Sequence, residues 1–470
     1  MFINDIGSVL SPEYPYNKEK PIHFKFKLTA DFFCEIFKKE FHLKLKKGKR
    51  MVFMKKRILS LVLIILTASL VFAQGAQEAK ANEKSTVRVM VWSSTLDTKL
   101  VPNDIEAKFE AAYPQYDLVF ESVEYDSLDS QTLLSHSTGN DYDVIMVNHS
   151  SLPTFVSGGV VAPIDDVVAN LDMEYYSRKA VDASKFNGHW YGIPFDPDCR
   201  ILAYNQKIIS ELGFDAPKTT DDVLAIAKAG FEKGYYAMAG GLNRNTFCIY
   251  DLGGFMLCWG INVYTQDANG KYICQLNTPE AVDYMKWAQE MYKYMPHDGN
   301  LDNSTARSWF AQGQVLMLWW TPSQIASVLP KFANREDCAF AEMPLGPSGV
   351  NGSAMGGYMW SMGSGAENPE GAKAFIQWAL QPEMQGQICR GLPADSRAYD
   401  YAPYNIPEYN MFREQISKAE YPVPLTSVLL QVFDTWNRTY AKCLMGEITP
   451  EKACEIGYKE VQAILDTINK

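Results

Sequence analysis

Short apolar runs alternate with amphipathic stretches from residue 87 to the C-terminus. Runs rich in Val, Ile, Met and aromatic residues, too short for helices, predict β-strands. The runs are Val87–Trp92, Leu118–Val123, Val144–Val147, Trp190–Ile193, Val315–Trp319, Ala339–Ala341 and Tyr358–Ser361. Because helical stretches such as Ile105–Ala112 lie between them, the pattern predicts an α/β fold with parallel sheets covered by helices.

Three helix starts share one sequence pattern, in which Thr or Asn is followed by Pro and Glu. They begin at Thr278, Asn368 and Thr449. The side-chain oxygen caps free amides, proline suits the first helical position, and the acid faces the positive end of the helix dipole. Thr219 or Thr220 is expected to cap a further helix, which Gly234 ends.

The apolar pattern is different before residue 84. After Met51 come Lys55-Lys56-Arg57, an apolar stretch from Ile58, and an exit at Ala73. A basic region, a short apolar region and small residues at the exit predict a secretory signal peptide over residues 51–73, cleaved near Ala73. A membrane anchor is the alternative, but even the stretch from Ile58 to Ala73 is shorter than the ~20 apolar residues that a spanning helix needs.

Residues 1–50 are interpreted as an upstream start rather than a domain, because a signal peptide belongs at the beginning of a protein. Met51 or Met54 would serve as the start. A cytoplasmic tail on an anchored protein is the alternative. Residues 74–84 have the composition of a flexible leader. No cysteine stands at the signal exit for lipid attachment, so a soluble periplasmic protein is expected.

The charge of the chain disfavours two classes of partner. The sequence has 44 basic and 55 acidic residues, and residues 1–73 hold 14 and 6 of them. The remaining 30 basic and 49 acidic residues give the rest of the chain a net charge of −19. Such a charge repels phosphate backbones and anionic lipid, which argues against binding to nucleic acid or to a membrane surface.

Eight cysteines follow the signal segment, and an even number in an exported protein permits disulfides. They are Cys199, Cys248, Cys258, Cys274, Cys338, Cys389, Cys443 and Cys454. No Cys-x-x-Cys pair occurs, and the interpretation as small buried hydrophobes is favoured. Cys443 and Cys454 are the best candidates for a disulfide, since a break at Gly446 would let their helices fold back on each other.

The sequence has none of the common enzyme motifs. Phosphate-binding and dinucleotide-binding glycine loops, the Gly-x-Ser-x-Gly elbow and His-Glu-x-x-His are all missing. The histidines after the signal segment (His136, His149, His189 and His297) do not cluster in the sequence. We therefore expect no catalytic residues, no metal and no cofactor. A secreted glycosidase that uses two scattered carboxylates is the alternative from another functional class.

Aromatic residues gather at predicted strand ends and turns. They include Trp92, Trp259, Trp319, Trp320, Tyr358 and Trp360. Sugar rings lie flat on aromatic faces through their C–H groups, and their hydroxyls need a few polar partners. A cleft lined by such strand ends suits a carbohydrate. Ordinary core packing is the competing explanation for each of these side chains.

A series of short motifs runs in order from about Thr86 to the C-terminus. They are the strand ending in Trp92, Tyr142-Asp143-Val144-Ile145, Trp190–Pro194 with Ala203-Tyr204-Asn205, Pro217–Thr220, Phe310–Met317, Met343–Pro347, and Gly356-Gly357 with Asn368–Ala372. Together they resemble family 1 extracellular solute-binding proteins of ABC importers, which include maltodextrin-binding and other sugar-binding proteins. Tyr142 stands where the family has a proline.

The resemblance implies a two-lobed periplasmic binding protein fold of type II, in which two α/β lobes are joined by crossover hinge strands. The expected crossings are near Phe195–Tyr204, Phe340–Gly346 and Gly391–Arg397. Residues 85–196 and 345–392 would form lobe 1, and residues 200–340 and 397–470 would form lobe 2. Ligand would be held between the lobes, which close by hinge rotation and are then read by the membrane permease subunits.

Carried over position by position, the resemblance also implies ligand-binding residues. They are Trp92, Ser93, Asn148, His149, Gly357 and Tyr358 from lobe 1, Tyr250, Trp259 and Trp320 from lobe 2, and Asp198 and Arg397 at the crossings. Asp198 matches the place of an acidic sugar ligand in maltodextrin-binding relatives, and a solvated turn acid is its alternative. Arg397 can fork two hydroxyls or one phosphate, or it can form a surface ion pair.

The expected function is the carbohydrate-binding component of an ABC importer, a monomer outside the inner membrane. A protein that binds glycerol phosphate or another small anion is the alternative within the binding class. Arg200 and Arg397 are the basic residues nearest the expected cleft, and their small number favours a neutral ligand.

Overall fold

A computed structural model describes residues 84–243, 247–421 and 423–469. The predicted signal peptide, the fifty residues before it and all but the last residue of the predicted leader lie outside the described residues. Lys84–Lys470 form one compact unit. Within the described ranges, no helix has both the length and the apolar composition needed to cross a membrane.

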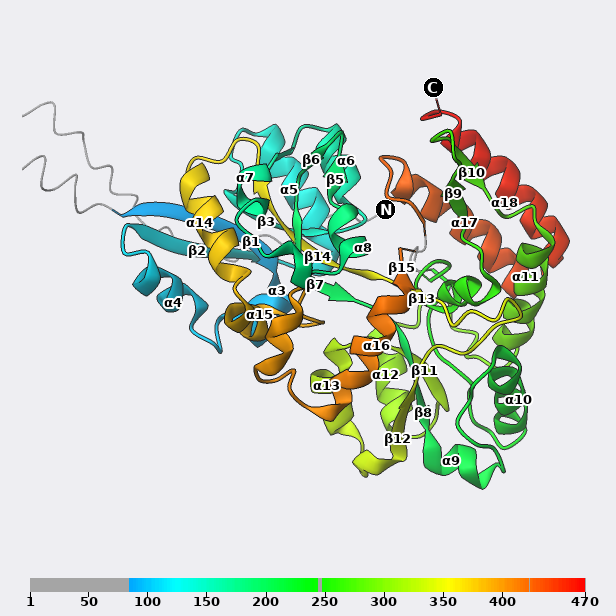
Figure 1. Cartoon of the computed structure of the whole chain (residues 1–470). Helices are drawn as coiled ribbons and strands as arrows, with labels where there is room; N and C mark the ends of the chain where they lie inside the picture. Colours follow the sequence, from blue (N-terminus) through cyan, green and yellow to red (C-terminus); the bar gives the residue numbers. More distant parts are fainter. Residues whose placement is uncertain (1–83, 244–246, 422, 470) are drawn as a thin grey trace, which may run out of the picture. The chain divides into compact units, whose positions relative to one another are not determined.

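The first of the two main sheets has the strand order β2-β1-β3-β14-β4, and β7 also pairs with β14 (Figure 1). Its strands are β1 (Ser85–Trp92), β2 (Tyr116–Val123), β3 (Val144–Asn148), β4 (Val161–Ala162), β7 (Ile193–Asp198) and β14 (Gly356–Gly363). Strand β1 runs parallel to β2 and β3, as predicted. Strand β14 is antiparallel to β3, β4 and β7, because the chain enters it on its return from the second sheet.

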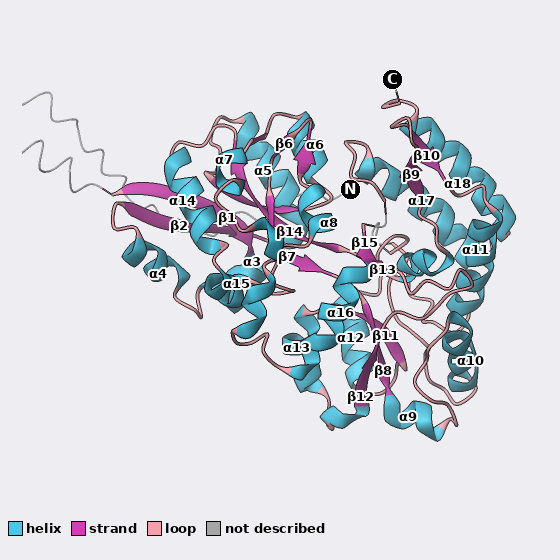
Figure 2. Ribbon diagram, in the orientation of Figure 1, coloured by secondary structure: helices cyan, strands magenta, loops and turns pink. Residues whose placement is uncertain are grey.

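Helices cover both faces of this sheet (Figure 2). They are α3 (Ser93–Thr95), α4 (Ile105–Ala112), α5 (Leu128–Ser137), α6 (Leu152–Ser157), α7 (Asp165–Val168), α8 (Arg178–Asp182), α14 (Pro369–Ala379) and α15 (Pro382–Ile388). Successive residues of a strand point to opposite faces, and here both faces are buried. Val89 belongs to the apolar cluster that includes Phe109 of α4, whereas its neighbour Met90 belongs to a second cluster with Leu152 of α6.

The second sheet has β8 (Ile201–Asn205) between β11 (Met317–Trp320) and β12 (Cys338–Ala341). Both neighbours are antiparallel to β8, so the prediction of a parallel sheet is wrong here. The register explains the direction. Trp320 at the end of β11 pairs with Ile201 at the start of β8, so β11 and β12 run towards the first sheet while β8 leaves it.

The helices that follow β8 pack around this second sheet and beyond it (Figure 1). They are α9 (Gln206–Glu211), α10 (Thr220–Phe231), α11 (Pro279–Tyr292), α12 (Asn303–Ala311), α13 (Ser323–Ser327), α16 (Asn410–Lys418), α17 (Leu429–Leu444) and α18 (Pro450–Leu465), with the 3-10 helix η4 (Leu252–Trp259). Small strand pairs complete the fold: β5 (Lys185–Phe186) with β6 (His189–Trp190), β9 (Tyr264–Gln266) with β10 (Tyr272–Cys274), and β13 (Ser353–Ala354) with β15 (Ala419–Glu420).

The predicted strand Trp190–Ile193 is divided in the structure, because β6 ends at Trp190 and β7 begins at Ile193. Gly192 lies in the break. A Cβ atom added there would come within 2.9 Å of the Ser361 hydroxyl oxygen on β14, so the chain passes close to the neighbouring strand. The apolar residues are continuous in sequence, but the two halves belong to different sheets.

The predicted helix caps are confirmed. The side chains of Thr278, Asn368 and Thr449 accept hydrogen bonds from backbone amides in the first turns of α11, α14 and α18. Of the two candidates before α10, Thr219 is the cap, and Asp222 completes a capping box with it.

The two sheets are joined closely at β7 and β8, where only Cys199 and Arg200 lie between the strands. This connection falls within the expected first crossing. A second contact between chain segments lies beside it, because the Leu392 amide donates to the Pro197 carbonyl and the Gly391 amide donates to the Asp196 carboxylate. The last expected crossing therefore runs alongside the first.

All eight cysteines after the signal segment are buried free thiols in the structure, Cys443 and Cys454 among them. Burial raises the pKa of both of these thiols to about 12. A thiol reacts as its thiolate, so thiols in such surroundings are chemically inert near neutral pH.

Candidate functional site

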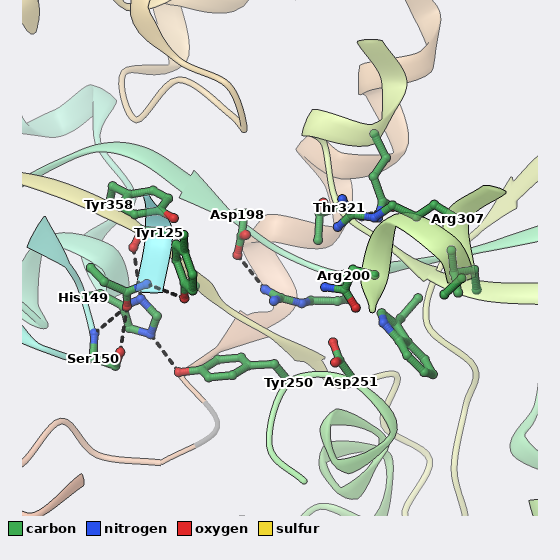
Figure 3. A pocket seen from close by; sticks show the side chains of 18 of the residues that line it. Tyr125, His149, Ser150, Asp198, Arg200, Tyr250, Asp251, Arg307, Thr321 and Tyr358 are labelled. Carbon is green, nitrogen blue, oxygen red and sulfur yellow. Dashed lines mark hydrogen bonds and ion pairs between the residues drawn. The ribbon is translucent and has the colours of Figure 1, made fainter. Parts of the chain in front are cut away.

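A cavity of about 130 Å³ lies where the ends of β3 and β14 approach β8, β11 and α12 (Figure 3). It is lined by Tyr125, Asn148, His149, Ser150, Asp198, Arg200, Ala239, Tyr250, Asp251, Asn303, Ala306, Arg307, Leu318, Trp319, Thr321, Gln324, Gly356, Gly357 and Tyr358. Both main sheets contribute to this lining. Clefts at strand ends are the usual ligand sites of open α/β sheets.

On the side of the first sheet, Asn148 ends β3 and pairs in register with Tyr358 of β14. The Asn148 side-chain oxygen accepts hydrogen bonds from the Ser150 amide at 3.0 Å and from its hydroxyl at 2.7 Å. Its Nδ2 atom donates to the Tyr125 hydroxyl at 3.4 Å. The loop after β3 is therefore held by side chains that also line the cavity.

Gly357 allows a close approach of backbone segments beside the cavity. Its φ of +123° is a conformation that residues with a Cβ rarely adopt, and an added Cβ would lie 2.3 Å from the Asp196 carbonyl oxygen. The Gly357 carbonyl accepts from the His149 amide at 3.2 Å and lies 3.1 Å from the His149 Nδ1 atom. Glycine at this position thus lets one carbonyl fix the orientation of the histidine.

The protonation of His149 follows from its two partners. A carbonyl can only accept, so Nδ1 carries the proton and donates to Gly357. Nε2 is then the acceptor for the hydroxyl of Tyr250, 2.8 Å away. Burial lowers the pKa of His149 to about 4, with the positive charge of Arg200 adding to the effect and the hydrogen bond to Gly357 opposing it. The imidazole is neutral near pH 7 and connects β3 to the segment before η4.

Arg200 lies at the centre of the charged part of the site (Figure 3). Its Nη1 atom is 2.6 Å from the Asp198 carboxylate, and its guanidinium lies 5.1 Å from the centre of the Tyr250 ring. Burial raises the pKa of Asp198 although Arg200 opposes that shift. Burial also disfavours the charged form of Arg200, but Asp198 and Asp251 outweigh it and raise the pKa of Arg200.

The side of the second sheet supplies an aromatic wall and several polar groups. Trp319 of β11 lines the cavity and packs edge-on against Phe247, with ring centres 5.9 Å apart. Asn303 and Arg307 are four residues apart on α12, so they share one helix face. Gln324 is buried and accepts from the Thr321 amide at 3.0 Å.

Six of the eleven residues expected at the site line this cavity. They are Asn148, His149, Asp198, Tyr250, Gly357 and Tyr358. Trp92 is not part of the lining, but its ring lies 5.4 Å from that of Tyr125 and 6.2 Å from that of Tyr358. Ser93 is not part of the lining either, and its hydroxyl donates to Glu124 at 2.8 Å. Trp92 therefore supports the aromatic wall from behind.

The structure places the other three expected residues elsewhere, which corrects their assignment to the cavity. Trp320 is fully buried between Phe310 and Phe340, because it points to the face of β11 opposite Trp319. The other two contact residues outside the lining. Trp259 donates to Asp283 and packs on Tyr284 and Trp287, and Arg397 pairs with Asp172 and Asp395 beside Tyr175.

Sequence reasoning missed several lining residues that come from unrelated parts of the chain. They include Tyr125, Ser150, Asp251, Asn303, Arg307, Thr321 and Gln324. Trp319 is among the aromatic residues that the sequence places at strand ends, but it is not among the expected ligand-binding residues. Two signals could have found some of them. Asp251 directly follows Tyr250, which was predicted to bind ligand. Trp319 is the neighbour of Trp320, which was also predicted to bind ligand, but the sequence did not show which face of the strand points to the site.

The arrangement provides what a polyhydroxylated ligand needs. Tyrosine and tryptophan rings offer flat apolar faces, while carboxylates, amides and guanidinium groups can each form paired hydrogen bonds with hydroxyls. Within the described residues, no group of three or more His, Cys, Asp and Glu side chains could hold a metal ion.

Comparison with known proteins agrees with this geometry. The chain is 25% identical over 325 residues to the maltotriose-binding protein of Pyrococcus abyssi, covering 65% of each chain, so it spans just under two thirds of that relative. It is 24% identical over 320 residues to the diacetylchitobiose binding protein of Streptomyces coelicolor, covering 66% of this chain and 72% of that protein.

Solved structures show the fold. The GacH receptor of Streptomyces glaucescens, crystallised unliganded and with acarbose, superposes with a TM-score of 0.71 at 19% identity, covering 82% of this chain and 99% of the receptor. The expected two-lobed α/β fold of the periplasmic binding proteins is thereby confirmed. The profile of the bacterial extracellular solute-binding proteins matches residues 92–386. Because this match covers more than half of the sequence, the chain belongs to the family of bacterial extracellular solute-binding proteins.

Proposed function

We propose that this protein is the extracytoplasmic binding component of an ABC importer, and that it holds a neutral sugar or polyol in the cavity of Figure 3. The observation that carries the proposal is the lining itself. Aromatic rings and hydroxyl-binding polar groups from both sheets converge on one space of about 130 Å³. Relatives of this chain are named for binding maltotriose and diacetylchitobiose, which supports a carbohydrate.

The balance of charge in the cavity favours a neutral ligand over an anion. Two carboxylates, Asp198 and Asp251, line it together with two guanidinium groups, Arg200 and Arg307. The positive charge of Arg200 is already offset by its ion pair with Asp198. A phosphate would bring negative charge close to both carboxylates, whereas sugar hydroxyls can accept from the arginines and donate to the acids.

The same geometry supports a receptor rather than a glycosidase. A glycosidase needs one carboxyl group as an acid and a second as a base or nucleophile, on opposite sides of the bond that breaks. Here Asp198 is engaged by a guanidinium at 2.6 Å, an arrangement suited to binding. We therefore assign the carboxylates to hydroxyl recognition.

We further propose that residues 85–196 with 345–392 and residues 200–340 with 397–470 act as the two lobes. A ligand that touches both lobes favours the closed arrangement, because only differential affinity can shift such an equilibrium. The closed form would then be delivered to the membrane permease. Export through the signal segment 51–73 would place the protein outside the inner membrane.

The test combines binding with shape. Thermal-shift screening of residues 74–470 against neutral sugars, alditols and glycerol 3-phosphate should identify a stabilising neutral compound, because a ligand bound only to the folded state raises the midpoint. X-ray scattering with that compound should show a smaller radius of gyration, and chromatography should recover the compound intact. Stabilisation by glycerol 3-phosphate alone, or consumption of the sugar, would contradict the proposal.

A matched pair of variants connects the binding to the site. Asp198→Asn removes a carboxylate that lines the cavity and should weaken binding at least 10-fold. Asp215→Asn makes the same change at an exposed position outside the lining and should leave affinity unchanged. Equal affinity in both variants would place the ligand elsewhere.

A further inference from the structure

The cavity is small compared with the ligands after which the relatives of this chain are named. We propose that it admits one sugar ring or one short open-chain polyol, and that Tyr125 excludes a second ring. This inference rests on the proposed function, since it concerns which carbohydrates the same site accepts. Maltotriose contains three rings and diacetylchitobiose contains two. Binding of a carbohydrate at this site and the limit to a single ring can therefore be tested separately.

The volume of the cavity fits a single ring. An apolar protein cavity of roughly 150 Å³ holds a single benzene ring. The cavity here measures about 130 Å³, which corresponds to one six-membered ring or a chain of similar size. A disaccharide needs about twice that space. The second ring would have to displace protein atoms or lie outside the cavity.

Enlarging the floor of the cavity to make that space would cost considerable free energy. Ala306, Leu318, Trp319 and Gln324 line it, and all four are buried. Protein interiors are packed as densely as organic crystals, so enlarging such a floor means moving several neighbours at once. Trp319, for example, is held edge-on by Phe247.

The wall between the two sheets is closed as well. His149 and Tyr250 are buried and joined by their 2.8 Å hydrogen bond. The ring of Tyr421 lies behind the imidazole, with centroids 4.9 Å apart. A ligand cannot extend in this direction without breaking the contact that joins the two sides.

Tyr125 is a large side chain in the lining that reaches solvent. It lines the cavity and yet is 41% exposed, so it lies where the cavity meets solvent. Its ring packs against Trp92, whose other contacts are Tyr358 and the guanidinium of Arg390 at 4.0 Å. Because Trp92 is itself held on several sides, Tyr125 has a fixed support and can act as a barrier.

The sequence around Tyr125 is consistent with this role. The residue begins a short 3-10 helix, Tyr125–Ser127, directly after β2 and before α5. Its hydroxyl accepts from Asn148 at 3.4 Å, which ties the barrier to the loop that carries His149. Because the side chain of Tyr125 is exposed, we expect its truncation to have little effect on the core.

The experiment measures affinities by calorimetry for single-ring sugars (glucose, galactose, mannose, xylose), for ribitol, and for maltose, cellobiose and maltotriose. The wild-type protein should bind at least one single-ring sugar or ribitol 100-fold more tightly than every disaccharide and trisaccharide. Tyr125→Ala should reduce that preference to less than 10-fold. Tyr125→Phe keeps the ring and should retain the wild-type preference.

The outcomes separate the two proposals. If maltose, cellobiose or maltotriose binds the wild-type protein as tightly as the single-ring compounds, the size limit is wrong while the proposed function stands. If neither these carbohydrates nor any neutral compound of the thermal-shift screen binds, the proposed function fails, and the size limit fails with it. If Tyr125→Ala has an unchanged melting temperature and still rejects disaccharides, Tyr125 is not the barrier.

Discussion

The Nε2 atom of His149 lies 2.8 Å from the hydroxyl oxygen of Tyr250 and joins the end of β3 in the first sheet to the segment before η4. Both residues line the cavity, and they reach it from parts of the chain about a hundred residues apart. The hydrogen bond between His149 and Tyr250 can form only when the two sides of the site lie close together. We expect the same arrangement when a ligand is enclosed.

Tyr250→Phe should weaken ligand binding by about 2- to 10-fold, since a hydrogen bond of this type contributes roughly 0.5–1.5 kcal/mol net. The loss should appear mainly as faster dissociation, because the contact joins the two sides of the proposed site. Stopped-flow fluorescence measures this directly. Tyr284→Phe is the matched control: its hydroxyl pairs with that of Tyr440 outside the cavity lining, so it should lower stability without changing dissociation. Identical dissociation in Tyr250→Phe and wild type would show that the hydrogen bond between His149 and Tyr250 does not help to retain the ligand.

Stability should depend on pH through His149. Its pKa is about 4 in the folded protein, against ~6.5 in an unfolded chain. The unfolded state binds the proton more readily, so the stabilisation from the neutral imidazole is complete above pH 6.5 and is lost as the pH falls towards 4. The groups that face the ring are Tyr250, Tyr421 and Arg200.

The protonation of Asp196 changes folding stability in the opposite direction over part of the same pH range. Burial raises its pKa to about 6, so its contribution is present at low pH and is lost as the pH rises through 6. Urea unfolding between pH 4.5 and 8, compared for wild type and His149→Gln, isolates the histidine because Asp196 is common to both. The variant should lose less stability on acidification. Parallel pH profiles would show that His149 is not responsible.

Trp319 and Trp320 are neighbours in sequence and should respond oppositely to truncation. Trp319→Ala should weaken sugar binding by about 1–3 kcal/mol, the size expected for a ligand-facing aromatic. Trp320→Ala should instead cost about 3–5 kcal/mol of folding stability, because it leaves a void between Phe310 and Phe340. Calorimetry at a temperature where both variants are folded separates the effects. Weaker binding by Trp320→Ala alone would reverse the assignment.

The exported protein should begin near Gln74. We expect the predicted signal peptide over residues 51–73 to be removed on export, and peptides from residues 1–50 to be missing if translation starts at Met51 or Met54. Mass spectrometry of the protein released from the cell envelope gives its N-terminus and intact mass. Peptides from residues 1–50 in that fraction would contradict this expectation.

Sequence alone determined the local structure well, because local signals depend on neighbouring residues. The helix starts at Thr278, Asn368 and Thr449 were correct, since a cap, a proline and an acid act within one turn. The extent of α4, Ile105–Ala112, was also predicted. The order of the motifs that resemble the family indicated the two-lobed fold. The same resemblance indicated four lining residues near the ends of β3 and β14, namely Asn148, His149, Gly357 and Tyr358.

Only the tertiary structure decided which way side chains face and which distant segments meet. The direction of β11 and β12 relative to β8 depends on where the chain returns from, which no local pattern contains. Trp319 and Trp320 differ in role because adjacent strand residues point to opposite faces of the sheet. A prediction that is wrong by one residue therefore places a core side chain in the cavity. Tyr125 and Arg307 belong to one site because folding brings them together, and physical contact between remote segments leaves no mark in a single sequence.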